Sequence, residues 1–227
     1  MKYPEILIPE NKALELAHFR EMDYFAVNNY KLPIEMMLEN AGLQLANFVA
    51  AFAEKGQRIK IGVGNGNNGG GGLVAARRLV ARGFMVYLDL FTEITKELPA
   101  KQLERALIFG AKTESISQPD VWIDAYLGFS QRLLLPQPLI EIIEDANRNR
   151  AVKISLDIPT GFTGDMNSQY FIADKILTLA APKKILYSLD LQTEIFIADL
   201  GIPNEVYAKF GTEQLPFYKS DILKLKR

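Results

Sequence analysis

The sequence contains no cysteine, which excludes disulfide bonds, thiolate metal sites and cysteine nucleophiles. Histidine is nearly absent as well, because His18 is the only one. No Gly-x-Ser-x-Gly motif occurs, and His18 lies far in sequence from any candidate nucleophile, so a serine triad is not indicated. We interpret His18 as a packing or surface residue of the first helix.

An excess of charge of either sign is also missing. Lysine and arginine number 26 against 27 aspartates and glutamates, and no basic stripe or long charge run occurs. We therefore do not expect nucleic acid as a partner. The N-terminal segment has no apolar signal core, and no run approaches the roughly 18 apolar residues of a membrane span. These features indicate a soluble, cytoplasmic protein with no membrane partner.

Hydrophobic residues, in contrast, are plentiful: they make up 48% of the 227 residues, enough for one substantial core. We predict a single domain over residues 1–227. Apolar residues at helical spacing predict two helices within 10–56, strands alternate with helices over 57–203, and we interpret 204–227 as a tail. Near-continuous apolar strands between helices are typical of an α/β fold whose mostly parallel sheet is covered by helices on both faces.

The segment 62–73 reads GVGNGNNGGGGL and joins a predicted strand, 58–63, to a helix expected to begin at Leu73. In open α/β sheets, ligands bind beyond the carboxyl ends of the strands, where the unpaired N–H groups of a helix N-terminus suit a phosphate. Glycines allow these N–H groups to approach a ligand closely. We interpret the segment as a backbone cradle for a nucleotide.

The sequence is less clear about which kind of nucleotide-binding loop this segment forms. The Walker pattern is excluded because no lysine followed by serine or threonine ends the loop. Gly64, Gly66 and Gly69 satisfy the dinucleotide pattern Gly-x-Gly-x-x-Gly, and Asp89 lies near the end of the next strand, where a ribose-binding carboxylate is expected. An NAD-dependent dehydrogenase is therefore one interpretation.

Two further strand ends carry carboxylates. Asp124 lies near the end of the strand in WIDAYLGFS, and Asp157 ends the strand in SLDIPTGF, three residues before Thr160. If the sheet is parallel, these side chains meet the asparagines of the glycine segment in one crevice. An all-oxygen group of this kind suits a hard cation or general acid/base chemistry and is a poor match for zinc.

Together these motifs resemble the YjeF N-terminal domain family of NAD(P)H-hydrate epimerases. The resemblance runs in chain order through MLENAG (37–42), GNGNNGGGGLVAARRL, DAYLGFS, LDIPTG, APK (181–183) and ADLGIP (198–203). It implies a three-layer Rossmann-like fold, usually dimeric. It also implies an isomerase that interconverts the R and S forms of NADH or NADPH hydrated at C6 of the nicotinamide ring.

The resemblance further implies the site residues. The substrate is expected to contact three parts of the chain. These are Asn67, Asn68, Gly69, Gly70 and Gly71 of the glycine segment; the segment from Gly128 to about Leu134, including Phe129 and Ser130; and Asp157. A potassium ion is expected at Asn68, Asp124 and Thr160. Loss of the C6 hydroxyl leaves a cation stabilised by the ring nitrogen, and water returning to the other face inverts the centre. Asp124 and Asp157 are our candidates for moving the protons.

Several positions depart from the family pattern: Gly71, the apolar segment that follows GFS, and Thr163, where an aspartate is usual. The usual loop reads GNNGGDG, and this chain has Gly71 where the aspartate stands. A non-catalytic nucleotide-binding or scaffold protein with a decayed site is therefore a second hypothesis, beside the epimerase and the dehydrogenase.

Arg77 and Arg78 do not distinguish NADH hydrate from NADPH hydrate, because both suit an ordinary helix surface. Met36, Met37 and Phe48 of the N-terminal helices are candidates for a dimer interface, although packing on the sheet explains them as well.

Overall fold

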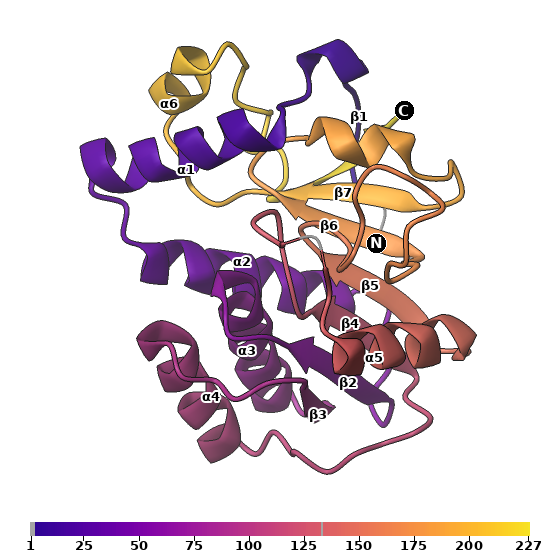
Figure 1. Ribbon diagram of the computed structural model, residues 1–227. Coiled ribbons are helices and arrows are strands. Elements are labelled where there is room, and N and C mark those ends of the chain that lie inside the picture. The colour runs from indigo at the N-terminus through magenta and orange to yellow at the C-terminus, as the bar shows by residue number, and fades with distance from the viewer. Residues whose placement is uncertain (1–2, 133) are drawn as a thin grey trace.

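The computed structural model describes residues 3–132 and 134–227 and has one eight-stranded sheet at its centre (Figure 1). Across the sheet the strands follow the order β1-β8-β7-β6-β5-β4-β2-β3. The strands are β1 (Glu5–Leu7), β2 (Arg58–Val63), β3 (Met85–Leu90), β4 (Val121–Ala125), β5 (Val152–Leu156), β6 (Lys175–Leu179), β7 (Glu194–Ala198) and β8 (Ile222–Lys226). All neighbouring pairs are parallel except β7 and β8.

The strand order changes direction at β2. The chain passes from β2 to β3 on one side and then returns to β4 on the other side of β2. Such a switch point opens a crevice beyond the carboxyl ends of the two strands, and it is where α/β sheets bind ligands. The glycine segment follows β2 and the segment after Ala125 follows β4, so both lie at this crevice.

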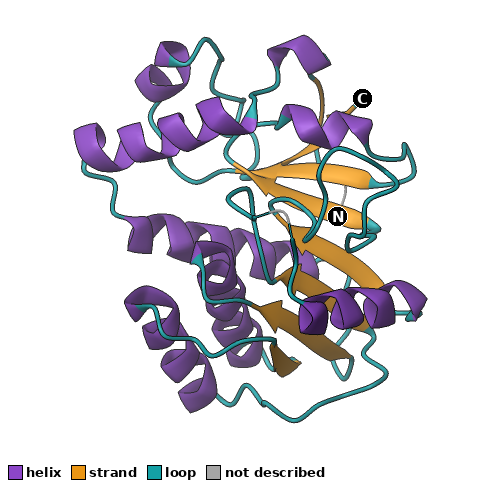
Figure 2. Ribbon diagram, in the orientation of Figure 1, coloured by secondary structure: helices purple, strands orange, loops and turns teal. Residues whose placement is uncertain are grey.

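Helices cover both faces of the sheet (Figures 1 and 2). They are α1 (Leu16–Tyr30), α2 (Ile34–Ala50), α3 (Asn67–Ala81), α4 (Glu97–Phe109), α5 (Gln137–Arg148) and α6 (Asn204–Lys209), with short 3-10 helices at Glu10–Lys12 and Lys184–Ser188. One core joins α2, α3 and α4 to one face, and a second joins α5 and the 3-10 helix 184–188 to the other. A third cluster holds α1 and α6 beside Ala180 and Ala181, just after β6.

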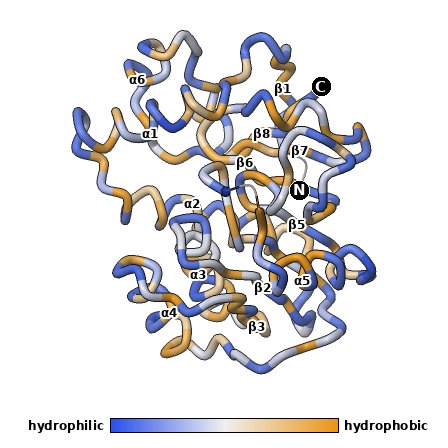
Figure 3. Tube along the Cα trace, viewed as in Figure 1, coloured by the Kyte–Doolittle hydropathy of each residue, from blue (hydrophilic) through white to orange (hydrophobic). Residues whose placement is uncertain are grey.

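Side chains that alternate along each strand supply the two faces. Ile123 belongs to the first core and its neighbour Trp122 to the second, and both are fully buried. A parallel strand that is buried on both faces needs apolar residues at nearly every position. The hydrophobic colour of the central strands in Figure 3 reflects this requirement. The predicted α/β fold with a mostly parallel, doubly covered sheet is confirmed, and the fold has the three layers expected.

The glycine segment differs from the prediction in one respect. Helix α3 begins at Asn67, six residues earlier than expected, so four consecutive glycines, 69–72, are helical and buried. Glycine disfavours helices, but tertiary packing outweighs this preference here. A Cβ at Gly69 would lie 2.0 Å from the Gly64 carbonyl oxygen, and one at Gly42 of α2 would lie 2.7 Å from that of Gly71. The glycines therefore allow backbones to pack closely, in addition to any contact with a ligand.

The C-terminal segment 204–227 is also more ordered than the expected tail. It forms α6 and then β8, which pairs antiparallel with β7 and parallel with β1. Both ends of the chain thus complete one edge of the sheet (Figure 1). Of the helices in the described residues, none combines the length and hydropathy required to cross a membrane.

Candidate functional site

A cavity of about 750 Å³ lies at the carboxyl edge of the sheet, next to the switch point. Its wall is formed by the start of α3, the segments that follow β4 and β5, and residues of α1 and α2. The N-terminal N–H groups of α3 have no partner within the helix, which favours an anionic or polar ligand here. A volume of this size is typical of pockets for small molecules and cofactors.

A buried network fixes the segments after β4 and β5 to each other. The fully buried Asp124 accepts hydrogen bonds from the Thr160 hydroxyl at 2.5 Å, the Thr160 N–H at 2.8 Å and the Ser155 hydroxyl at 2.8 Å. The Tyr126 N–H donates to the same carboxylate at 3.3 Å. Burial raises the pKa of Asp124 to about 6, although these hydrogen bonds act to lower it. The carboxylate does not line the cavity and lies behind its wall.

Asn68 connects this network to α3. Its side-chain amide donates to the carbonyl oxygen of Leu127 at 2.6 Å and to that of Leu156 at 3.1 Å. The Leu127 N–H in turn donates to the Thr160 hydroxyl at 3.1 Å. Among the described residues, no group donates a hydrogen bond to the amide oxygen of Asn68. Asn68 is thus linked to Thr160 and Asp124 through Leu127, and its amide oxygen accepts no hydrogen bond from the described residues.

Asp157 lies on the cavity wall and is held by a fully buried lysine. Lys183 Nζ lies 2.8 Å from Asp157 Oδ1, and it also donates to the Thr178 hydroxyl at 3.0 Å and to the Leu179 carbonyl at 2.8 Å. The second carboxylate oxygen accepts the Phe129 N–H at 3.1 Å. Burial lowers the pKa of Lys183, while the charge of Asp157 acts to raise it. Asp157 also has a positive φ of 73°, a backbone conformation that non-glycine residues seldom adopt and that is found more often at functional sites.

Sequence reasoning did not identify Lys183 or Asp23 as site residues. Lys183 belongs to the APK motif, but its role depends on β6 bringing it beside Asp157, which no local pattern reveals. Asp23 lies one helical turn after Phe19 on α1, and both line the cavity. The sequence does hold one signal for Asp23, because it is a charged residue beside the buried positions 19, 22 and 26 of a helix. Lys96 and Arg132, both exposed, add positive charge to the wall.

The predicted substrate contacts divide into two groups. The residues that line the cavity are Asn67, Asn68, Gly71, Gly128, Phe129, Ser130 and Asp157. Gly69 and Gly70 are buried in the packing of α3 and do not line it. Within the predicted segment from Gly128 to Leu134, Leu133 lies outside the described residues.

The dinucleotide interpretation required Asp89 to face the ligand, and it does not. Asp89 pairs with Lys60 at 3.0 Å, accepts a hydrogen bond from the Tyr126 hydroxyl at 2.7 Å, and is absent from the wall of the large cavity. Lys60 and Tyr126 therefore already occupy the Asp89 carboxylate. This arrangement removes the ribose-binding carboxylate from the dehydrogenase hypothesis.

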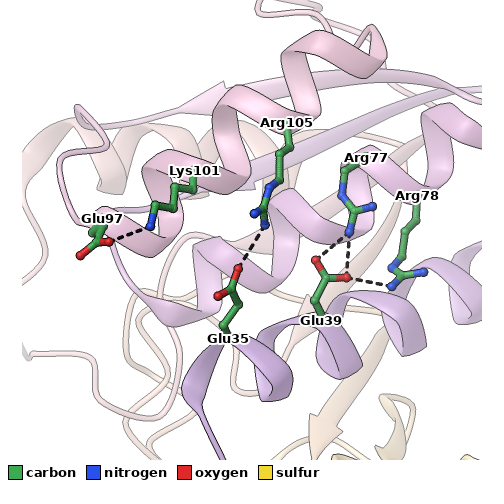
Figure 4. Close-up of polar contacts among 7 residues, drawn as sticks. All are labelled: Glu35, Glu39, Arg77, Arg78, Glu97, Lys101 and Arg105. Carbon is green, nitrogen blue, oxygen red and sulfur yellow. Dashed lines mark hydrogen bonds and ion pairs between the residues drawn. The ribbon is translucent and has the colours of Figure 1, made fainter.

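Arg77 and Arg78 are likewise occupied elsewhere. Both guanidinium groups bind Glu39 of α2, at 2.7 and 2.8 Å, and Figure 4 shows them between the helices. Neither arginine lines the cavity. The two arginines form salt bridges between α3 and α2, and they do not distinguish one nicotinamide cofactor from another.

The donor atoms around Asp124 fit one kind of metal ion. They are oxygens, with a single formal negative charge, and hard cations prefer oxygen ligands. Among the described residues there is no group of three or more histidine, cysteine, aspartate or glutamate side chains placed to hold a metal. A singly charged hard cation therefore matches the arrangement better than a divalent or softer metal does.

Comparisons with known proteins identify the family of this chain. Residues 34–185 match the family model described as YjeF-related protein N-terminus. The NAD(P)H-hydrate epimerase of Rhodopirellula baltica is 32% identical over 210 residues, which cover 85% of each chain. That of Dehalogenimonas lykanthroporepellens is 32% identical over 223 residues and covers 91% of this chain and 89% of its own.

A solved structure shares the fold. The crystal structure of yeast ynu0 superposes with a TM-score of 0.84, covers 94% of this chain and 100% of its own, and is 24% identical. The family match includes the glycine segment, Asp124, Asp157, Thr160 and Lys183. This chain therefore belongs to the YjeF-related protein N-terminus family.

Proposed function

We propose that this protein is an isomerase that interconverts the R and S forms of hydrated NADH and NADPH and so takes part in the repair of damaged nicotinamide cofactors. The observation that carries the proposal is the Asp157–Lys183 pair, which holds a carboxylate on the wall of a cofactor-sized cavity. Relatives named NAD(P)H-hydrate epimerase, at 32% identity over most of both chains, support it.

The reaction needs proton transfer and little else. A protonated group gives its proton to the C6 hydroxyl, the C6–O bond breaks, and water leaves behind a cation that the ring nitrogen stabilises. Water then adds to the opposite face and loses a proton, which restores the hydrate with inverted configuration. Asp157 lines the cavity and can exchange these protons. Asp124, our other candidate, is fully buried behind the wall, where it orients Thr160 and the segment after β4.

The test starts from one purified epimer of NADH hydrate and follows the R/S composition by chromatography. We expect the wild-type protein to accelerate epimerisation strongly over buffer. We expect Asp157→Asn to lower the rate by about 100-fold or more, as the loss of a general acid or base does. A wild-type protein no faster than buffer would refute the enzymatic proposal.

We also propose a potassium ion at Asn68, Asp124 and Thr160. The free amide oxygen of Asn68 and the oxygen donors around Asp124 support it. When bound, the ion supplies positive charge that balances Asp124 and the negative groups of the substrate. We expect potassium chloride to raise the melting temperature more than sodium chloride at equal ionic strength, and Asn68→Ala to abolish this difference. An equal effect of the two salts would contradict the ion site.

Ligand stabilisation separates the proposal from its alternatives. An epimerase is stabilised against heat by hydrated NADH, whereas a dehydrogenase is stabilised by NAD and transfers hydride. A scaffold protein with a decayed site responds to neither. Asp89, which a dehydrogenase would use for the ribose, is paired with Lys60, so the dehydrogenase is the less favoured alternative.

We infer that the protein is a homodimer and acts in the cytoplasm, where nicotinamide cofactors are in constant use. Of the interface candidates on α2, Met37 and Phe48 are buried in the core, whereas Met36 is 55% exposed. Tyr24 on α1, at 58% exposed, adds a second apolar side chain for a partner copy. Light scattering should give the mass of a dimer, and Met36→Glu should shift it toward the monomer. A fluorescent fusion protein tests the location.

A further inference from the structure

A second carboxylate, Asp23, faces the cavity from α1. Helix α1 buries Phe19, Met22 and Ala26, and Asp23 lies beside this buried stripe, one turn after Phe19. Asp23 and Phe19 both line the cavity. Helix α1 packs beside α6 in a cluster separate from the two sheet faces, so Asp23 reaches the cavity from an element other than the one that supplies Asp157.

Asp23 lies near the Asp157–Lys183 pair. The Phe19 ring covers the Lys183 ammonium group, with 3.7 Å from Nζ to the ring centroid. Lys183 and Asp157 both act on the charge of Asp23: burial and Asp157 raise its pKa, and Lys183 lowers it. The site thus holds the carboxylates of Asp23 and Asp157 and the ammonium group of Lys183. Of the two carboxylates, Asp157 forms the direct ion pair with Lys183.

Nothing in the fold explains a carboxylate at position 23. The described residues offer the Asp23 side chain no hydrogen bond and no ion pair. Its place in the middle of α1 brings no benefit from the helix dipole, and aspartate is a poor residue for a helix interior. A half-buried carboxylate without a partner lowers stability. Such a group in a cavity is what a catalytic acid requires.

We propose that Asp23 is a catalytic residue that exchanges protons with the C6 oxygen on one face of the nicotinamide ring, while Asp157 serves the other face. This inference rests on the proposed epimerase function. In one direction, protonated Asp23 gives its proton to the C6 hydroxyl and the C6–O bond breaks to release water. A water molecule then attacks the opposite face, forms the new C6–O bond and gives its proton to the Asp157 carboxylate.

The cycle is balanced without any further reactant. The substrate loses one water and regains one, and one proton passes from Asp23 to Asp157. Exchange with solvent water then takes the proton from Asp157 and returns one to Asp23, which restores the starting state. The reverse reaction uses the same groups with the roles exchanged, as an epimerase that works in both directions requires. Lys183 holds the Asp157 carboxylate in place through the ion pair at 2.8 Å, and Asp157 lies on the cavity wall, where it can meet this proton.

The test compares Asp23→Asn, Asp23→Glu and Glu21→Gln with the wild-type protein. Glu21→Gln is the matched control, because it removes a carboxylate from an exposed position of α1 outside the cavity wall. We expect Asp23→Asn to lower kcat by about 100-fold with little change in KM or in the stabilisation by hydrated NADH. Asp23→Glu should recover part of this loss, and Glu21→Gln should have wild-type kinetics.

Each other result overturns the inference. A kcat for Asp23→Asn within about threefold of wild type would show that the carboxyl group does not act in the rate-limiting chemistry. A loss that falls on KM alone would make Asp23 a binding residue. Failure of Asp23→Asn to fold would show that the carboxylate is structural. A wild-type protein without epimerase activity would refute the proposed function as well, and the wild-type control distinguishes this case from the others.

Discussion

At the scale of single residues, Thr160 has two structural roles. Its hydroxyl donates to the buried Asp124 at 2.5 Å and accepts the Leu127 N–H at 3.1 Å. We expect Thr160→Val to lower the free energy of unfolding by about 2–3 kcal/mol, since it removes a hydrogen bond to a buried charged group and leaves the partly buried Leu127 N–H unpaired. Thr160→Ser, which keeps the oxygen, should cost less than about 1 kcal/mol. Urea unfolding measures both, and equal losses would contradict these roles.

Gly71 is one residue at which the chain departs from its family, and it lines the cavity. A Cβ here would lie 3.2 Å from Leu156 Cδ2 and 3.6 Å from Ala41 Cβ, so a small shift of Leu156 makes room. We expect Gly71→Asp to fold and to raise kcat/KM by roughly tenfold, because a charged hydrogen bond to substrate contributes about 1.5–3 kcal/mol. Gly71→Ala controls for the added Cβ. An unchanged or lower kcat/KM for Gly71→Asp would show that the site functions fully without the family aspartate.

At the scale of elements, ion pairs fasten α2 to α3. Glu39 accepts from Arg77 and Arg78 between the helices, and Glu35 binds Arg105 of α4 in a more exposed position (Figure 4). Burial acts to raise the pKa of Glu39, but the hydrogen bonds and charges of the two arginines outweigh it and lower the pKa below 4.5. The stability that this group contributes is complete above pH 4.5 and is lost as the pH falls through the lowered value.

We therefore expect Glu39→Gln to lower the free energy of unfolding by about 1 kcal/mol at pH 7, with a difference that shrinks as the pH falls below 4.5. Denaturant unfolding at several pH values measures it. Glu35→Gln is the control and should change stability by less than about 0.5 kcal/mol, because its pair is exposed. A difference that stays constant between pH 7 and pH 3 would contradict the ion-pair interpretation.

The elements also show how far the sequence can predict the fold. Strands such as β2 and β4 could be predicted because long apolar runs suffice for a doubly covered sheet. The start of α3 could not, because four glycines are locally unfavourable in a helix and only their close packing makes them acceptable.

The candidate site divides in the same way. Asp124, Asp157 and Thr160 follow strands and share a sheet edge, so a parallel arrangement predicts their proximity. Lys183 and Asp23 could not be placed, because their positions depend on the tertiary packing of β6 and α1 around the cavity. That packing also separates the two predicted aspartates, since Asp157 lines the cavity and Asp124 lies behind its wall.

At the scale of the whole molecule, β8 near the C-terminus joins the N-terminal strand β1 to the rest of the sheet. Its hydrogen bonds run to β1 and β7, whose residues are separated by most of the chain, so no local pattern marks the pairing. Leu223 of β8 is 1% exposed and belongs to the core that also includes α5. The C-terminal strand is thus part of the second core as well as of the sheet.

We expect Leu223→Asp to lower the free energy of unfolding by about 3–5 kcal/mol, because it buries an unpaired charge and removes an apolar side chain. If the sheet unfolds as one unit, circular dichroism and tryptophan fluorescence from Trp122 will report the same transition. Lys226→Asp, an exposed change in the same strand, should alter stability by less than about 1 kcal/mol. A loss equally small for Leu223→Asp, or a separate early transition confined to the C-terminal segment, would show that β8 is a detachable edge and not a part of the cooperative core.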